Sequence, residues 1–118
     1  DNRPHMHYPI ILRCTGASSA WLSPAFDQPT CFFGFVVYYA DDGSLSEAGL
    51  HFLSEVEKLL AEEGGRPHWG KYYDASLYRW QDLYPHWASF RALREQFDPQ
   101  GRLSNDYTAA LFNQFDKG

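Results

Sequence analysis

The opening third of the chain carries two hydrophobic segments whose patterns are typical of β-strands. In residues 8–15, successive side chains point to opposite faces, which places Ile11 and Arg13 together on one face. Residues 31–39 are aromatic and β-branched and show no polar alternation, which predicts a strand covered on both faces. The intervening residues 16–30 are rich in Ser, Pro and Gly and are interpreted as a loop.

Apolar residues recur at helical spacing after the second strand. We expect a helix over residues 45–63, with Ser44 and Glu47 forming a capping box at its start. Gly64-Gly65 should end this helix, and the proline at position 67 prevents it from resuming. Residues 71–84 have a mixed pattern that predicts two short helical turns.

Two further helices are predicted towards the end of the chain. The first spans residues 85–97 and has Pro85 in its first turn. The Asp-Pro-Gln-Gly sequence of residues 98–101 is typical of a type I turn. The last helix is expected over residues 104–115, with Ser104 or Asn105 as its cap.

The order of these elements predicts an α+β fold, in which a small antiparallel sheet packs with several helices. Two strands are too few for a stable sheet. We therefore expect another part of the protein, or a partner, to complete the sheet. An open sheet edge also favours a homo-oligomer that hides it.

Composition narrows the class of protein. The chain has 118 residues, of which 44% are hydrophobic, so it is globular and forms one domain or part of one. The net charge of −5 argues against nucleic acid and against an anionic membrane surface as partners. No apolar run approaches the length needed to span a membrane. Residues 1–6 resemble a cloning remnant, so residues 7–118 are taken as the protein's own region.

Cysteine and histidine spacing gives little sign of metal or redox chemistry. Cys14 and Cys31 fit no CxxC pattern, so we expect two free, buried thiols in a reducing, cytoplasmic setting. A disulfide between neighbouring strands is the alternative. The five histidines lack the spacing of zinc ligands, so we expect no metal site.

One short segment concentrates groups that can carry chemistry. Pro67-His68-Trp69-Gly70-Lys71 follows the predicted helix stop and combines a titratable ring, a large aromatic side chain and a cation. Loops held by rigid elements are common places for functional sites. Composition alone does not distinguish such a site from a surface turn with a buried tryptophan.

The motif order along the chain resembles a known enzyme family. Residues 64–71 are similar to the C-terminal motif of the sugar-lactone and alditol oxidases, which are FAD enzymes of the vanillyl-alcohol-oxidase type. The similarity covers residues 8–115 and includes the upstream loop at residues 21–26. Its later motifs, in order, are Leu83-Tyr84-Pro85, Phe90, Phe97-Asp98-Pro99 with Gly101, and Asn105-Asp106-Tyr107.

The resemblance implies that some residues of this chain face an FAD cofactor. FAD would be bound mainly by an N-terminal domain outside the chain, and residues 7–118 would form the C-terminal, substrate-side region. Lys71 would lie beside flavin and substrate as a catalytic cation that stabilises the reduced flavin. Asn105 and Tyr107 belong to the closing segment that returns to the cofactor. A solvated surface lysine is the alternative for Lys71.

The resemblance also implies substrate-side residues in the motif and on the first strand. His68 and Trp69 would contact the substrate, although a hydrogen-bonded structural role is the alternative for His68. Arg13 would be catalytic, as the surviving half of a Glu-x-Arg pair whose glutamate is replaced by Ile11. The alternative for Arg13 is an ion pair with an acidic residue.

On the second strand the family's histidine and hydroxyl residue are replaced by Gly34 and Val36, and Tyr38 shares their face. Together with the missing glutamate, these changes remove the groups that would recognise a polyol. The expected function is therefore FAD-dependent oxidation of a small-molecule alcohol or lactone by hydride transfer, with a substrate that is bulkier or less polar than a polyol. This chain alone should be inactive. The alternative is a non-catalytic interaction or regulatory module that keeps the oxidase scaffold.

Overall fold

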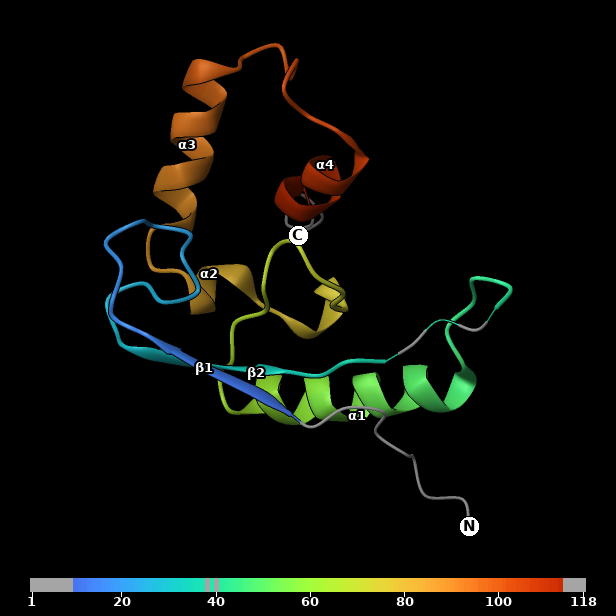
Figure 1. Cartoon of the computed structure of the whole chain (residues 1–118). Coiled ribbons are helices and arrows are strands. Elements are labelled where there is room, and N and C mark those ends of the chain that lie inside the picture. The colour runs from blue at the N-terminus through green and yellow to red at the C-terminus, as the bar shows by residue number, and fades with distance from the viewer. Residues whose placement is uncertain (1–9, 38, 40, 114–118) are drawn as a thin grey trace.

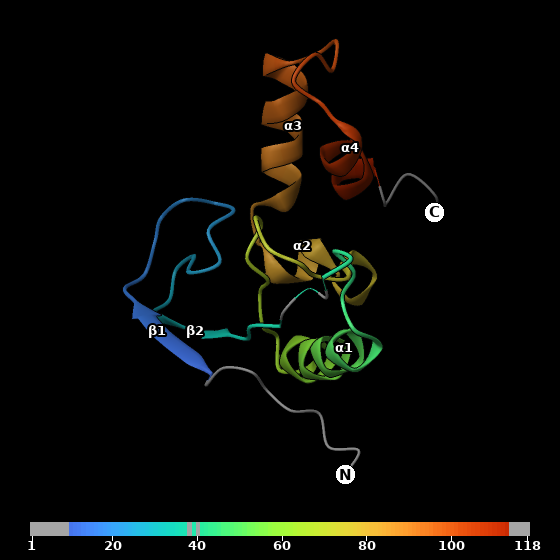
Figure 2. The same ribbon diagram turned by 45° about the vertical axis from the view of Figure 1, so that its right-hand side comes forward.

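The computed structural model describes residues 10–37, 39 and 41–113, and it confirms the α+β class. In both views the hairpin and the long helix lie at one end, the last two helices lie at the other, and α2 lies between them (Figures 1 and 2). None of the described helices is long and apolar enough to cross a membrane. The elements in order are β1 (Ile11–Thr15), β2 (Thr30–Gly34), α1 (Glu47–Glu62), the 3-10 turn η1 (Ala75–Leu77), α2 (Trp80–Leu83), α3 (Trp87–Phe97) and α4 (Asp106–Asn113).

The sheet is a two-stranded antiparallel ribbon in the described part of the chain. Both strands are shorter than predicted, and β2 ends at Gly34, five residues before the expected end. The predicted coverage of both faces is wrong. Exposure alternates along β2, and every residue of β1 is exposed. A continuous apolar strand is typical of a sheet whose two faces are both covered by other elements. Among the described residues, one face of this ribbon is not covered by any helix or strand.

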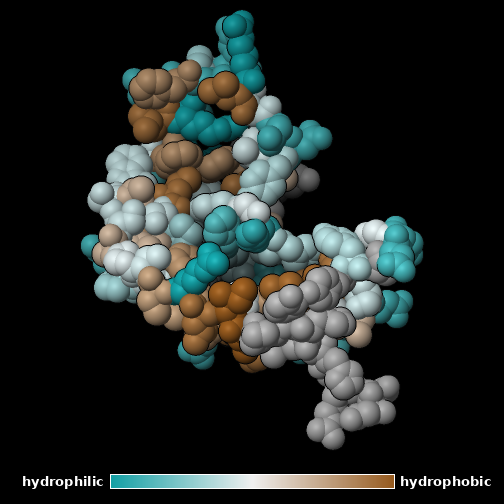
Figure 3. Space-filling model, viewed as in Figure 1, coloured by the Kyte–Doolittle hydropathy of each residue, from teal (hydrophilic) through white to brown (hydrophobic). Residues whose placement is uncertain are grey.

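Exposed side chains of the ribbon include Leu12, 60% exposed, and Phe33, 50% exposed. Figure 3 shows hydrophobic residues gathered at the surface where β1 lies. Cys14 and Cys31 are free, as predicted, but they are exposed rather than buried. The predicted burial of the two thiols is wrong because it assumed that other elements cover both faces of the sheet.

Helix α1 begins at Glu47, two residues later than predicted, and the expected capping box at Ser44 is wrong. The cap is Ser46, whose hydroxyl accepts a hydrogen bond from the Gly49 amide at 3.0 Å. The Ser44 hydroxyl instead donates to the Asp42 carboxylate at 2.6 Å. Because the Ser44 side chain is bonded within this turn, it does not cap the helix that follows.

The predicted stop of α1 at Gly64-Gly65 is confirmed. Gly64 has a φ of 75°, and its amide donates to the Ala61 carbonyl at 3.0 Å. The Gly65 amide donates to the Leu60 carbonyl at 2.8 Å, which completes a Schellman motif. A Cβ on Gly65 would lie 2.5 Å from the Leu60 carbonyl oxygen, so only glycine fits there. This stop sets the direction in which the chain enters the motif at residues 67–71.

The C-terminal helices follow the predicted order with shifted boundaries. Helix α3 begins at Trp87, because the Trp87 amide closes a turn on the Tyr84 carbonyl at 2.9 Å and leaves Pro85 outside the helix. The turn at residues 98–101 is confirmed by a 3.0 Å bond from the Gly101 amide to the Asp98 carbonyl. Asn105 caps the N-terminus of α4, because its side-chain oxygen accepts a hydrogen bond from the Thr108 amide at 2.9 Å.

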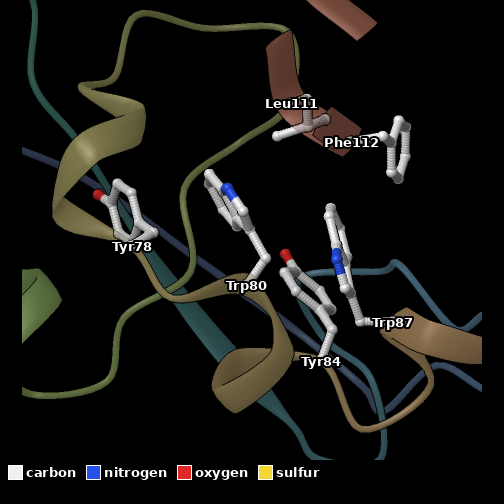
Figure 4. Packing of buried hydrophobic residues seen from close by; sticks show 6 residues of the cluster. All are labelled: Tyr78, Trp80, Tyr84, Trp87, Leu111 and Phe112. Carbon is white, nitrogen blue, oxygen red and sulfur yellow. The ribbon is translucent and has the colours of Figure 1, made fainter. Parts of the chain in front are cut away.

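The buried core is aromatic and joins α2, α3 and α4 (Figure 4). Rings follow one another closely: the centroids of Trp80 and Trp87 are 6.0 Å apart, and those of Trp87 and Phe112 are 4.9 Å apart. The buried members are Tyr78, Trp80, Tyr84, Trp87, Leu111 and Phe112. The sheet contributes none of them, so the ribbon lies outside the core and the motif loop lies beside it.

Candidate functional site

The motif loop ends in a tight turn that presents Lys71. The Lys71 amide donates to the His68 carbonyl at 3.0 Å, which closes the turn. The His68 ring lies on the surface, and its Nδ1 accepts a hydrogen bond from the Gly70 amide at 3.0 Å. The imidazole therefore holds the turn that precedes Lys71.

Trp69 anchors the same loop in the core. Its Nε1 donates to the Leu22 carbonyl at 2.7 Å, and its ring stacks on Tyr84 with centroids 5.3 Å apart. Arg66 adds a second tie to this region, because its guanidinium donates to the carbonyls of Pro24 and Phe26, each at 3.3 Å. Two segments that carried the family resemblance, residues 21–26 and 64–71, are thus hydrogen-bonded to each other.

An open hollow of about 310 Å³ lies between this loop and α4. Lys71 and Tyr107, which the resemblance placed on the cofactor side, both line it. The remaining lining is mostly aromatic or apolar, so Lys71 is its one cationic side chain among the described residues. The full lining is Lys71, Tyr72, Tyr73, Ala75, Tyr107, Ala110 and Leu111.

A tyrosine pair holds the two sides of the hollow together. The Tyr107 hydroxyl donates to the Trp69 carbonyl at 3.1 Å and also shares a hydrogen bond with the Tyr73 hydroxyl. A tyrosine has one proton to donate. Because Tyr107 gives its proton to Trp69, the Tyr73 hydroxyl must be the donor between the two. Burial, and then the bond to Tyr107, raise the pKa of Tyr73 well above its usual range, which keeps that donor protonated.

Tyr73 is a hydrogen-bonding residue of this site that the sequence did not predict. Its only sequence signal is its position two residues after Lys71. Asn105 was predicted on the cofactor side, and its side chain is used to cap α4. The Lys71 ammonium has no hydrogen bond or ion pair in the part of the chain that the structure describes.

The predicted sheet residues form a separate group. Ile11 lies opposite Gly34 and Arg13 lies opposite Phe32, so the predicted common face is confirmed for these positions. A Cβ on Gly34 would lie 3.3 Å from the Ile11 Cβ, so Ile11 occupies the space expected beside the glycine. Val36 lies beyond the end of β2, and Tyr38 lies outside the described residues.

Arg13 and Lys71 do not line one hollow. β1 and α4 lie at opposite ends of the molecule in both views, with α2 between them (Figures 1 and 2). The Arg13 side chain is exposed and makes no ion pair with any acidic residue in the described ranges. The described residues also contain no group of three or more His, Cys, Asp or Glu side chains that could hold a metal ion.

Comparison with known proteins gives a consistent family. Residues 1–111 match the family described as D-arabinono-1,4-lactone oxidase. The chain is 44% identical over 116 residues to a long-chain alcohol oxidase of an uncultured marine euryarchaeote, covering 89% of the chain and 22% of that protein.

Two named lactone enzymes also match. An L-gulono-1,4-lactone dehydrogenase of Mycobacterium tuberculosis is 33% identical, covering 86% of the chain and 22% of that protein. An L-gulonolactone oxidase of Bos taurus is 32% identical, covering 90% of the chain and 24% of that protein. The chain therefore spans about a quarter of the length of the curated relatives it matches.

Proposed function

Because the chain belongs to the D-arabinono-1,4-lactone oxidase family, we propose that it forms the C-terminal, substrate-side part of an FAD-dependent oxidoreductase. The whole protein would oxidise a CH–OH group by hydride transfer. The observation that carries this proposal is that Lys71 and Tyr107 line the same hollow. These residues are 36 positions apart in the sequence, and the family resemblance implies the cofactor side for both.

The residues around the hollow fit a flavin. FAD would be held mainly by a part of the protein outside this chain, and when bound it supplies the hydride acceptor. Lys71 offers an ammonium group with no partner in the described residues, as an anionic group would need. The Tyr107 hydroxyl and the Asn105 side chain are already engaged, so their role would be to support the surface of the hollow.

Lys71 would act through its charge. Negative charge develops on the acceptor side as a hydride leaves the substrate, and a fixed cation there lowers the barrier. The turn closed by His68 and the tie from Tyr107 to Trp69 would hold that cation in place. Arg13 would supply a second positive charge from the sheet, outside this hollow.

The substrate is proposed to be an alcohol less polar than a polyol. Ile11 and Gly34 share one sheet face and offer no side-chain hydrogen-bonding group. A relative named long-chain alcohol oxidase, 44% identical to this chain, supports the same direction.

The test uses the full-length polypeptide that carries this chain. It would be purified with its flavin, made anaerobic, and mixed in turn with a long-chain primary alcohol, an alditol and an aldonolactone. We expect the flavin absorbance to bleach fastest with the long-chain alcohol. Faster bleaching with the alditol or the lactone would show the substrate assignment to be wrong while leaving the oxidoreductase assignment intact. A colourless protein that fails to bind FAD would favour the non-catalytic module.

A further inference from the structure

The two cysteines of the chain meet across the ribbon. Cys14 of β1 is the register partner of Cys31 of β2, and both side chains are exposed. Residues directly opposite each other in an antiparallel pair project to the same face. Their Cα atoms are about 4.5 or 5.5 Å apart, according to the type of pair. Both separations lie within the range that a disulfide spans, about 4.4 to 6.8 Å.

We propose that Cys14 and Cys31 form a reversible cross-strand disulfide when the protein meets hydrogen peroxide. The proposal is independent of the function assigned to the hollow, because it rests on the register and exposure of the two thiols. The pair lies on the sheet face opposite to Ile11 and Arg13, since positions 11 and 13 alternate with position 14 along the strand.

Hydrogen bonding with Cys14 raises the pKa of the Cys31 thiol, with smaller contributions from burial and from charge on Cys14. The raised pKa disfavours the Cys31 thiolate, so the second, resolving step falls to Cys31 and the first attack on the oxidant to Cys14. This matches the order needed for a two-step oxidation, in which one sulfur attacks the oxidant and the other resolves the product.

The chemistry balances with peroxide as the only oxidant. The Cys14 thiolate attacks one oxygen, the O–O bond breaks, and the departing hydroxide takes a proton to become water. The resulting sulfenic acid is attacked by the Cys31 sulfur, the S–O bond breaks, and the second hydroxide leaves as water with the Cys31 proton. Two thiols are oxidised by two electrons in total, and one peroxide is reduced to two waters.

The bond would close the base of the loop that connects β1 and β2. Residues 14 and 31 are separated from that loop by the last ladder pair, Thr15 and Thr30. The loop contains Leu22, whose carbonyl accepts the Trp69 indole N–H at 2.7 Å. Oxidation would therefore fix the base of the segment against which the Lys71 turn is anchored.

The test is disulfide mapping on the full-length polypeptide that carries this chain. The reduced protein would be treated with hydrogen peroxide, alkylated, digested without reductant and analysed by mass spectrometry. We expect a peptide pair joined through Cys14 and Cys31, lighter by about 2 Da than the sum of the reduced peptides and separated again by dithiothreitol. The bond should form within one molecule, so non-reducing electrophoresis should show no covalent dimer.

Cys14→Ser and Cys31→Ser are the matched controls. Each should abolish the joined peptide, and Cys31→Ser should leave a trappable sulfenic acid on Cys14 that no thiol in the ribbon resolves. Circular dichroism would establish that both variants fold. Peroxide treatment that leaves both wild-type thiols open to alkylation, oxidises each separately, or joins them only between molecules would overturn the proposal.

Discussion

The hydroxyl of Tyr107 donates a hydrogen bond to the backbone carbonyl of Trp69 at 3.1 Å, across 38 positions of sequence. This contact fastens α4 to the loop that carries Lys71. The same hydroxyl receives the bond from Tyr73, so one side chain connects both walls of the hollow. The arrangement explains why a motif near the end of the chain belongs with one in its middle.

Replacing Tyr107 by phenylalanine should loosen this connection. Loss of the tie to Trp69, with the Tyr73 hydroxyl left without its acceptor, should lower the free energy of unfolding by about 1 to 2 kcal/mol. Urea denaturation would measure it. Tyr39→Phe is the control, because Tyr39 is 69% exposed and its hydroxyl has no bond among the described residues. Equal effects of the two changes would contradict the role given to Tyr107.

Replacing Lys71 by methionine tests the proposed cation. Methionine keeps much of the length and removes the charge, so the rate of substrate-dependent flavin bleaching in the full-length protein should fall by about 100-fold. Stability should change little, because the Lys71 side chain is exposed. Lys58→Met is the matched control, since Lys58 lies on α1 and pairs with Glu55 at 3.0 Å, away from the hollow. If the two variants bleach equally fast, Lys71 has no such role.

Replacement by phenylalanine should affect two core tyrosines differently. The Tyr84 hydroxyl is buried and has no partner among the described residues, so Tyr84→Phe should leave the free energy of unfolding unchanged or raise it by about 1 kcal/mol. The Tyr78 hydroxyl donates to the Glu57 carboxylate at 3.0 Å, so Tyr78→Phe should lower that energy by about 1.5 kcal/mol or more. Chemical denaturation of both variants beside the wild type would decide, and a clear loss of stability in Tyr84→Phe would contradict the prediction.

Alkaline stability should depend on Tyr84 as well. Burial raises the pKa of Tyr84 to about 12, against an opposing effect of the Arg66 cation. An unfolded tyrosine has a pKa of about 10, so the stabilisation linked to the neutral phenol is complete below about pH 10 and is lost between about pH 10 and about pH 12. Over that interval the unfolded state loses the proton first.

Tyr84→Phe should therefore make the fall of stability with pH shallower in this window, by up to about 1.4 kcal/mol per pH unit. Tyr73 and Tyr78, whose pKa values burial also raises, remain in the variant and keep part of the slope. Denaturation curves across the window would measure the difference. Identical slopes for the variant and the wild type would show that Tyr84 does not titrate with unfolding.

The sequence by itself determined the local features of this protein. The stop of α1 at Gly64-Gly65, the turn at residues 98–101 and the narrowing of the α4 cap to Ser104 or Asn105 each depend on contacts within about five residues. Ile11 and Arg13 could be placed on one face because strand alternation is also local. The family could also be recognised from the sequence, because the resemblance rests on short local motifs that occur in a fixed order.

Tertiary structure decided which distant residues meet. Trp69 donates to Leu22 across 47 positions, which makes it an anchor of the core, and no short pattern encodes that pairing. The exposure of Cys14 and Cys31 was decided in the same way, because an apolar strand is buried only where another layer covers it. Tyr73 became part of the site only when packing of the aromatic core brought α4 against the Lys71 loop.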